Sequence, residues 1–156
     1  MAKPKMRVMF ELNDELSPAR SETLWADYVG QHRYRLRNIP FFVESVSMDD
    51  IIYAPPNREG IATFSHVISK GGNRTVRFVV PEVEAQGQMA RLEVEPVIEA
   101  LKSLGCGMEG HDQYLFSANV PLTSCLACVV ETLSGFGAVW DVIDDAGPIH
   151  RPVDVH

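Results

Sequence analysis

TVRFVVP (Thr75–Pro81) opens the stretch of sequence that decides the fold, because it begins an alternation of strand-like and helix-like apolar patterns. Three strand candidates and two helix candidates follow it: VEPVIEALKSL (Val94–Leu104), CGMEGHD (Cys106–Asp112), YLFSANV (Tyr114–Val120), SCLACVVETLSGF (Ser124–Phe136) and VWDVIDD (Val139–Asp145). This βαββαβ order predicts a ferredoxin-like sandwich, in which two helices cover one face of an antiparallel sheet.

The ends of both predicted helices carry ordinary helix signals. Pro96 suits a first turn, and Gly105 suits a C-terminal stop. Thr123 or Ser124 is the expected N-cap of the second helix. Five residues of that helix are expected to form its buried stripe: Cys125, Leu126, Val129, Val130 and Leu133.

The first half reads as short strands without a helix between them. Apolar and polar residues alternate over Met6–Leu12, Gln31–Arg37 and Ile61–Ser69. Between the first two of these ranges, Leu24 and Trp25 are expected in the core. These strands predict a small β-barrel-like or curled antiparallel sheet. The whole chain is therefore expected to be α+β. Its predicted units are a mostly-β unit at 1–74, the ferredoxin-like unit at 75–148 and a flexible tail at 149–156.

Charge separates the two halves of this 156-residue chain. Through Arg74 it has ten Lys or Arg and nine Asp or Glu; from Thr75 it has four and twelve, which gives that half a net charge of −8. Such a half repels phosphate backbones and favours a protein with a basic surface, so nucleic acid is not an expected partner.

No apolar run is long enough to cross a bilayer, and the N-terminus lacks a signal-peptide pattern. The odd count of three cysteines favours a reducing, cytoplasmic location.

Several motifs carry a family resemblance: Leu24-Trp25-Ala26, YRLRNIPFFV at 34–43, Thr75-Val76-Arg77, Leu104-Gly105-Cys106 with Glu109, and Asn119-Val120-Pro121. On these residues the chain resembles the bacterial family catalogued as domain of unknown function 4265. The resemblance implies a β unit followed by an α/β unit, and it brings no activity and no catalytic residue. Family members commonly have a glycine before an aspartate where this chain has Met48-Asp49-Asp50, so we expect a different turn there.

Motifs for catalysis, metals and cofactors are weak. Cys125-x-x-Cys128 would suit a redox site at a helix N-terminus, but we interpret these residues as buried helix cysteines because the motif lacks the usual proline or aromatic. No second CxxC or histidine pair completes a metal site. His111 beside Asp112 could act as a general base, although a solvated turn explains the pair equally well. We therefore expect no cofactor, no metal and no catalytic residue.

Charged side chains are the remaining candidates for a binding surface. Six acidic residues of the second half are candidate contacts for a partner: Glu109, Asp112, Glu131, Asp141, Asp144 and Asp145. Arg33, Arg35 and Arg37 share one strand face and could contact an anion or an interface.

These observations favour a non-catalytic protein-binding module. Its most concrete form is an immunity-type inhibitor that covers a cationic partner with an acidic surface, since charge complementarity speeds association. The alternative is a regulatory protein that senses a small molecule with its ferredoxin-like unit. A small hydrolase that uses His111 or a cysteine is the third hypothesis. The sequence does not fix the oligomeric state.

Overall fold

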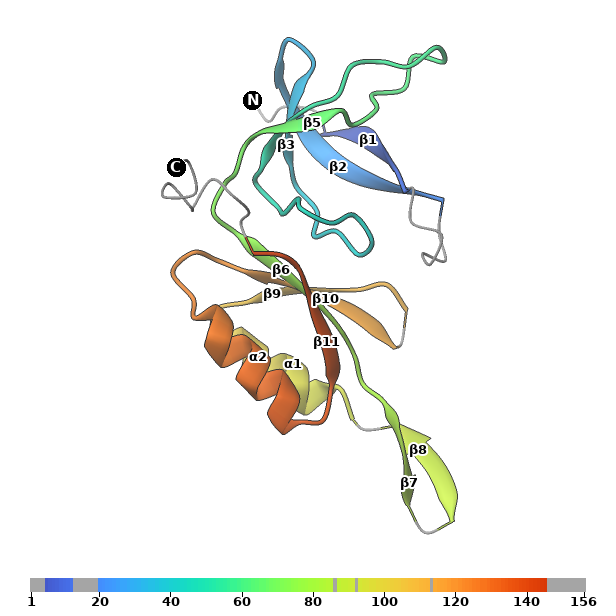
Figure 1. Cartoon of the computed structure of the whole chain (residues 1–156), viewed down its shortest axis with the longest axis vertical. Helices are drawn as coiled ribbons and strands as arrows, with labels where there is room; N and C mark the ends of the chain where they lie inside the picture. The colour runs from blue at the N-terminus through green and yellow to red at the C-terminus, as the bar shows by residue number, and fades with distance from the viewer. Residues whose placement is uncertain (1–4, 13–19, 86, 92, 113, 146–156) are drawn as a thin grey trace, which may run out of the picture.

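The computed structural model describes residues 5–12, 20–85, 87–91, 93–112 and 114–145 (Figure 1). Within these ranges the chain is α+β, with two larger antiparallel sheets, a separate hairpin and two helices. Neither helix is long and apolar enough to span a bilayer within the described part of the chain. The tail predicted over 149–156 lies outside the described residues, and the division into units 1–74 and 75–148 stays a prediction.

The first sheet contains five strands in sequence order: β1 (Lys5–Glu11), β2 (Ser21–Gly30), β3 (Arg33–Leu36), β4 (Ile51–Tyr53) and β5 (His66–Ser69). Every neighbouring pair is antiparallel, as predicted. The far edge of β1 meets residues 62–64. There the Met9 N–H donates to the Ala62 carbonyl at 2.9 Å, and the Phe64 N–H donates to the Met9 carbonyl at 2.8 Å. These two bonds join the first strand to the segment that precedes the last one.

Alternating side chains supply the core of this sheet. Phe10 of β1, Leu24 of β2, and Tyr34 and Leu36 of β3 are buried together. The prediction for Leu24 is confirmed, but the prediction that Trp25 belongs to the core is wrong, because its side chain is 40% exposed. Successive side chains of a strand point to opposite faces, so the burial of Leu24 turns its neighbour outward.

The second half contains the predicted βαββαβ elements: β6 (Arg74–Val79), α1 (Glu95–Ser103), β9 (Gly107–Gly110), β10 (Leu115–Val120), α2 (Leu126–Gly135) and β11 (Val139–Asp144). The order in the sheet is β11-β6-β10-β9, and all three pairs are antiparallel. The hairpin of β7 (Glu82–Ala85) and β8 (Gln88–Arg91), which was not predicted, follows β6 and projects away from the first sheet (Figure 1).

Both helices pack on the same face of this second sheet. One apolar cluster joins the buried side chains of both helices to Phe78 and its neighbours on the sheet. The helix residues in it are Val97 and Leu101 of α1 and Val129 and Leu133 of α2. Leu126, Val129 and Leu133 of the stripe predicted for the second helix therefore face the sheet, as an amphipathic pattern requires.

The start of α2 differs from its prediction. Cys125 is the N-cap, so neither Thr123 nor Ser124 has that role. The Cys125 side chain is exposed and does not belong to the buried stripe, and Cys128 is half-buried. The two cysteines form a disulfide.

The connection between β3 and β4 lies on the face of the second sheet that the helices leave open. The Ser117 hydroxyl donates to the Pro40 carbonyl at 2.7 Å, and the Arg77 guanidinium donates to the Phe41 carbonyl at 3.0 Å. The NIPFF run at 38–42 is therefore a bridge between the two sheets.

One carboxylate attaches the same run to the first sheet. Glu22 on β2 accepts three backbone N–H groups, from Phe41 at 2.8 Å, Phe42 at 3.1 Å and Val43 at 3.0 Å. Hydrogen bonds to a charged acceptor are stronger than neutral ones. Glu22 therefore positions the connection that the second sheet receives.

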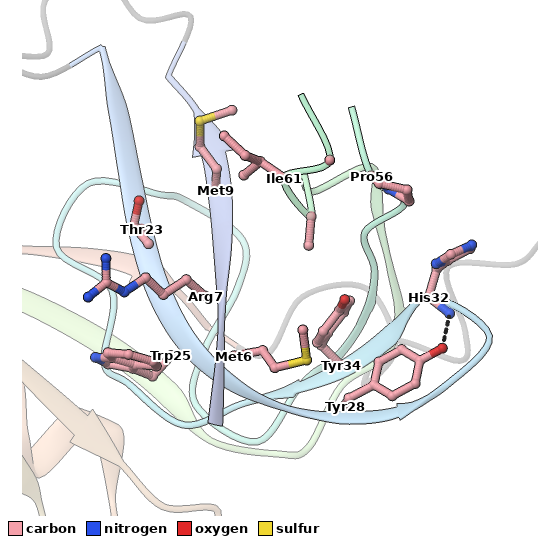
Figure 2. A pocket seen from close by; sticks show the side chains of 12 residues that line it. Met6, Arg7, Met9, Thr23, Trp25, Tyr28, His32, Tyr34, Pro56 and Ile61 are labelled. Carbon is pink, nitrogen blue, oxygen red and sulfur yellow. Dashed lines mark hydrogen bonds between the residues drawn. The ribbon is translucent and has the colours of Figure 1, made fainter. Parts of the chain in front are cut away.

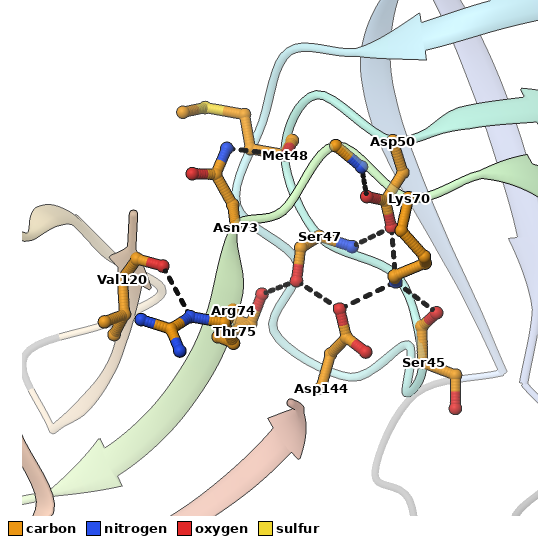
Figure 3. A network of polar contacts seen from close by, with 11 residues as sticks. Ser45, Ser47, Met48, Asp50, Lys70, Asn73, Arg74, Thr75, Val120 and Asp144 are labelled. Carbon is orange, nitrogen blue, oxygen red and sulfur yellow. Dashed lines mark hydrogen bonds and ion pairs between the residues drawn. The ribbon is translucent and has the colours of Figure 1, made fainter. Parts of the chain in front are cut away.

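A buried ion cluster lies where the chain passes from the first sheet to the second (Figure 3). Lys70 follows β5, and its Nζ lies 2.5 Å from Asp50 Oδ2 and 2.8 Å from Asp144 Oδ2. The three side chains are only 3%, 0% and 1% exposed, in that order. The Ser47 hydroxyl donates to Asp144 at 2.5 Å and shares a 2.6 Å hydrogen bond with Thr75.

Burial and hydrogen bonding act against each other at Asp50. Burial raises the pKa of its carboxyl above the ordinary value, whereas the Lys70 ammonium and the N–H groups of Gly71 and Ser47 lower it. The Lys70 ammonium thus forms ion pairs with two carboxylates that are both buried away from water. Removal of such a cation leaves uncompensated charge in the interior.

The turn before β4 contains a residue in an unusual conformation. Asp49 has a φ of +74°, in the left-handed region that glycine favours. Its carboxylate accepts hydrogen bonds from Arg37 at 2.8 Å and from Asn73 at 3.2 Å. This chain therefore keeps a turn of the kind that glycine favours, and side-chain bonds hold the aspartate in it.

We expect Lys70→Met to lower the free energy of unfolding by about 3–5 kcal/mol, because it leaves the Asp50 and Asp144 carboxylates in the interior without their cation. Chemical denaturation measures the loss. Lys102→Met is the matched control, since Lys102 is exposed on α1, and it should change stability by less than about 0.5 kcal/mol. Equal stability of the two variants would contradict the role given to Lys70.

Glu22→Gln should cost about 1–3 kcal/mol of stability, because an amide oxygen replaces a charged acceptor of three N–H groups. Glu11→Gln changes an exposed carboxylate of the same sheet and serves as the control. Thermal or chemical unfolding of both variants gives the comparison. A Glu22 variant as stable as the Glu11 variant would show that the connection is held by other contacts.

Candidate functional site

An open groove of about 860 Å³ lies beside β1, between that strand and the loop at 55–62 (Figure 2). Its walls are mainly apolar and aromatic, and the principal side chains are Met6, Met9, Trp25, Tyr28, Tyr34 and Ile61. Four of these, Met6, Trp25, Tyr28 and Ile61, are about 40% exposed. Contiguous exposed apolar surface of this kind marks a binding site more often than it marks ordinary surface.

The groove exists because β1 and the segment at 57–64, which meet at Met9, separate toward the start of β1. β1 bonds to residues 62–64 at Met9, but residues 57–61 turn away from it. The Asn57 side chain fixes this turn: its Oδ1 accepts the N–H groups of Glu59 at 2.8 Å and Ile61 at 3.0 Å. The start of β1 therefore faces open space where a neighbouring strand would lie.

The unpaired edge of β1 is centred on Arg7. Backbone groups alternate sides along a strand, and those of Met9 point into the seam, so those of Arg7 do as well. The pairing with β2 agrees: the carbonyl of Trp25, which is opposite Arg7, points away from β1 and accepts the Arg37 N–H at 2.8 Å. No hydrogen bond joins the N–H or carbonyl of Arg7 to another residue in the described ranges. One donor and one acceptor are thus available in the groove.

Polar side chains are few and lie at the rim. The Arg7 guanidinium stacks over the Trp25 ring, 4.9 Å from its centroid, and so keeps its charge beside an aromatic surface. The Tyr28 hydroxyl accepts the His32 N–H at 3.3 Å, as Figure 2 shows. Burial, with a contribution from Tyr28, raises the pKa of Tyr34 above its ordinary value. The Tyr34 phenol is therefore neutral and can donate.

A smaller hollow of about 420 Å³ lies between the two sheets, and His111 is in its wall with Glu22 and Glu109. The His111 ring packs against Phe41 and Phe42, with centroids 5.2 Å and 5.1 Å away. The neighbouring Asp112 carboxylate caps the turn by accepting the N–H groups of residues 114 and 115, both at 2.7 Å. These contacts give His111 a packing role at the interface.

The acidic residues predicted as a partner surface differ in burial and lie on different elements. Asp144 is a correction: it is buried and bonded to Lys70, so it cannot contact a partner. Asp141 pairs with Arg77 at 2.8 Å, and Glu109 accepts from Asn38 at 3.5 Å. The others are exposed but lie on different elements: Asp112 in the β9–β10 turn, Glu131 on α2 and Asp145 after β11.

The predicted arginine row is part of the first sheet. Arg35 and Arg37 are exposed and Arg33 is half-buried, while the alternate residues of β3 are buried. Arg37 forms ion pairs with Asp49 at 2.8 Å and Asp27 at 3.5 Å, and Arg33 donates to the Gly30 carbonyl at 3.1 Å. Two of the three arginines thus have partners within the chain.

Sequence reasoning missed the groove, although parts of its signal are present. Trp25 alternates with the buried Leu24, and Asn57 with Gly60 marks a turn, but neither pattern says which edge stays unpaired. In the described ranges, no group of three or more His, Cys, Asp or Glu residues could hold a metal ion.

Comparison with known proteins identifies a family and a shared fold. A family described as a domain of unknown function (DUF4265) matches residues 22–142. A solved structure of a hypothetical protein from Neisseria gonorrhoeae is similar to this chain, with a TM-score of 0.74 and 16% sequence identity, and the match covers 92% of this chain and 97% of that one. A comparison with curated proteins gave no match. At 16% identity the likeness shows the fold alone.

Proposed function

The chain belongs to the family of domain of unknown function 4265, and we propose that it is a protein-binding module that takes up an extended peptide segment of a partner along β1. The observation that supports this proposal is the unpaired edge at Arg7, which lies inside an apolar groove. A free strand edge can bind another chain through its backbone groups. Pockets beside the edge then select among side chains.

The groove favours one kind of segment. An added strand would alternate its side chains, so that one set meets the apolar wall of Met6, Tyr28 and Ile61 while the other set faces Arg7 and Trp25. Methionine adapts its shape to different apolar side chains, and aromatic rings supply large contact areas. We therefore propose a segment with apolar residues at alternate positions and an acidic residue that reaches Arg7.

The C-terminal unit would then be a scaffold for this site. We assign it to the ferredoxin-like arrangement on the strand order β11-β6-β10-β9 with both helices on one face. Its open face receives the NIPFF run, whose other side is held by Glu22 of β2. In this proposal the scaffold keeps β2, and with it β1, in place.

The charge distribution supports a second candidate, the immunity-type inhibitor of a cationic partner. The exposed charges on the helix layer are Glu95, Glu99 and Glu131, against Lys102 alone. A basic partner on this layer would bind less tightly as salt rises. Binding in the β1 groove would vary less with salt, because it would depend mainly on backbone hydrogen bonds and apolar burial and would add one ion pair, at Arg7.

Arg7→Pro and Arg7→Ala test the strand-addition proposal as a matched pair. Both variants lose the guanidinium, but only the proline lacks the edge N–H, and proline is tolerated at an edge whose N–H is unused by the fold. Peptides are selected from a phage-displayed random library on the wild-type protein and measured by calorimetry. We expect Arg7→Pro to bind them roughly tenfold more weakly than Arg7→Ala.

Equal affinities for the two variants would overturn strand addition. Failure of the library to yield alternating apolar peptides would overturn the proposed specificity. A partner whose binding is unchanged in both variants, and is abolished by salt and by Glu131→Lys, would support the inhibitor function instead.

A further inference from the structure

We propose that Cys125 and Cys128 are a thiol–disulfide exchange site, at which low-molecular-weight monothiols of the glutathione class reduce and re-form the bond. The site lies on the second sheet's helix layer and is independent of the β1 groove. It also explains a motif that the proposed peptide binding does not use.

The positions of the two cysteines differ in a way that suits exchange. Their Cα atoms are 5.2 Å apart, which is within the range of an ordinary disulfide. Cys125 is exposed, and Cys128 is half-buried in the first turn of α2. An incoming thiolate can therefore reach the sulfur of Cys125 more easily than that of Cys128.

The N-terminus of α2 stabilises negative charge on Cys125. The Cys128 N–H donates to Cys125 Sγ at 3.1 Å, and the positive end of the helix dipole lies at the same place. The first turn of α2 has no acidic side chain that would oppose this charge. A thiolate released at Cys125 would thus find a donor already in position.

The loop before Cys125 is held by a half-buried side chain of β6. The Arg74 guanidinium donates to the carbonyls of Val120 at 3.2 Å, Pro121 at 2.9 Å and Ser124 at 2.6 Å. The same guanidinium places a permanent cation at the carbonyl of Ser124, the residue that precedes Cys125. Because the loop is fixed from below, reduction can proceed without loss of the helix cap.

Reduction of the Cys125–Cys128 disulfide takes two thiol–disulfide exchange steps. A monothiolate attacks Cys125 Sγ, the bond between the cysteines breaks, and Cys128 leaves as a thiolate that takes up a proton. A second monothiolate attacks the external sulfur of the mixed disulfide and releases Cys125 as a thiolate. Two thiols are oxidised to one external disulfide, and the protein disulfide is reduced to two thiols.

Cys106 supplies an internal contrast. It is buried in the core of the second sheet, and burial raises the pKa of its thiol, an effect that Arg74 partly offsets. Buried thiols of this kind are inert. Exchange should therefore involve two of the three cysteines.

The test uses the full, folded chain in buffers with different ratios of reduced to oxidised glutathione, followed by rapid alkylation and peptide mass spectrometry. We expect Cys125 and Cys128 to become alkylated together, in one two-electron transition, while Cys106 stays unlabelled. Two outcomes would overturn the proposal: a disulfide that is reduced only after denaturant is added, or labelling of Cys106 in parallel with the pair.

Single variants assign the attacked sulfur. Cys128→Ser should accumulate a glutathione adduct on Cys125 at least tenfold faster than Cys125→Ser accumulates one on Cys128. Equal rates would overturn the assignment of Cys125, and an adduct on neither residue would overturn the exchange site. The wild-type experiment decides the proposal if a variant fails to fold.

Discussion

The rest of the structure depends on one buried cation. Lys70 forms ion pairs with both Asp50, which precedes β4 of the first sheet, and Asp144, which ends β11 of the second. The two carboxylates come from distant parts of the sequence, so their attraction to one ammonium joins the two sheets at this point. A buried ion pair seldom adds net stability over an apolar core, but it penalises every arrangement in which a charge lacks its partner. The contribution of Lys70 is therefore specificity of arrangement.

The interface and the groove have a common origin in β2. Glu22, near the start of that strand, holds the NIPFF run that lies on the second sheet. Trp25, three residues later on the same strand, forms part of the groove wall. The NIPFF run is therefore structural: it is attached to the strand that carries Trp25 of the proposed site. The second sheet is covered on one face by the two helices and is contacted on the other by this run.

Local periodicity predicted most of the fold. Apolar residues at helical spacing over 94–104 and 124–136 predicted both helices, and alternation over 31–37 predicted the strand whose Tyr34 and Leu36 are buried. Errors arose where position depends on distant partners. Asp144 looked like a surface carboxylate because nothing nearby in the sequence shows that Lys70 will meet it. Cys125 was assigned to the apolar stripe because Thr123 or Ser124 was the expected cap, whereas Cys125 itself is the N-cap. The groove was missed because an unpaired edge is a property of strand pairing, which the sequence pattern of β1 alone does not contain.

Residue-resolved amide hydrogen exchange of β1 measures whether the edge of this strand is open inside the groove. The Met9 amide is bonded to Ala62, whereas the Arg7 amide faces the groove. We expect the Arg7 amide to exchange much faster than the Met9 amide in the free protein, and to slow to a comparable rate when a selected peptide is bound. Protection of Arg7 equal to that of Met9 without any ligand would contradict the account, because the edge would then already be paired.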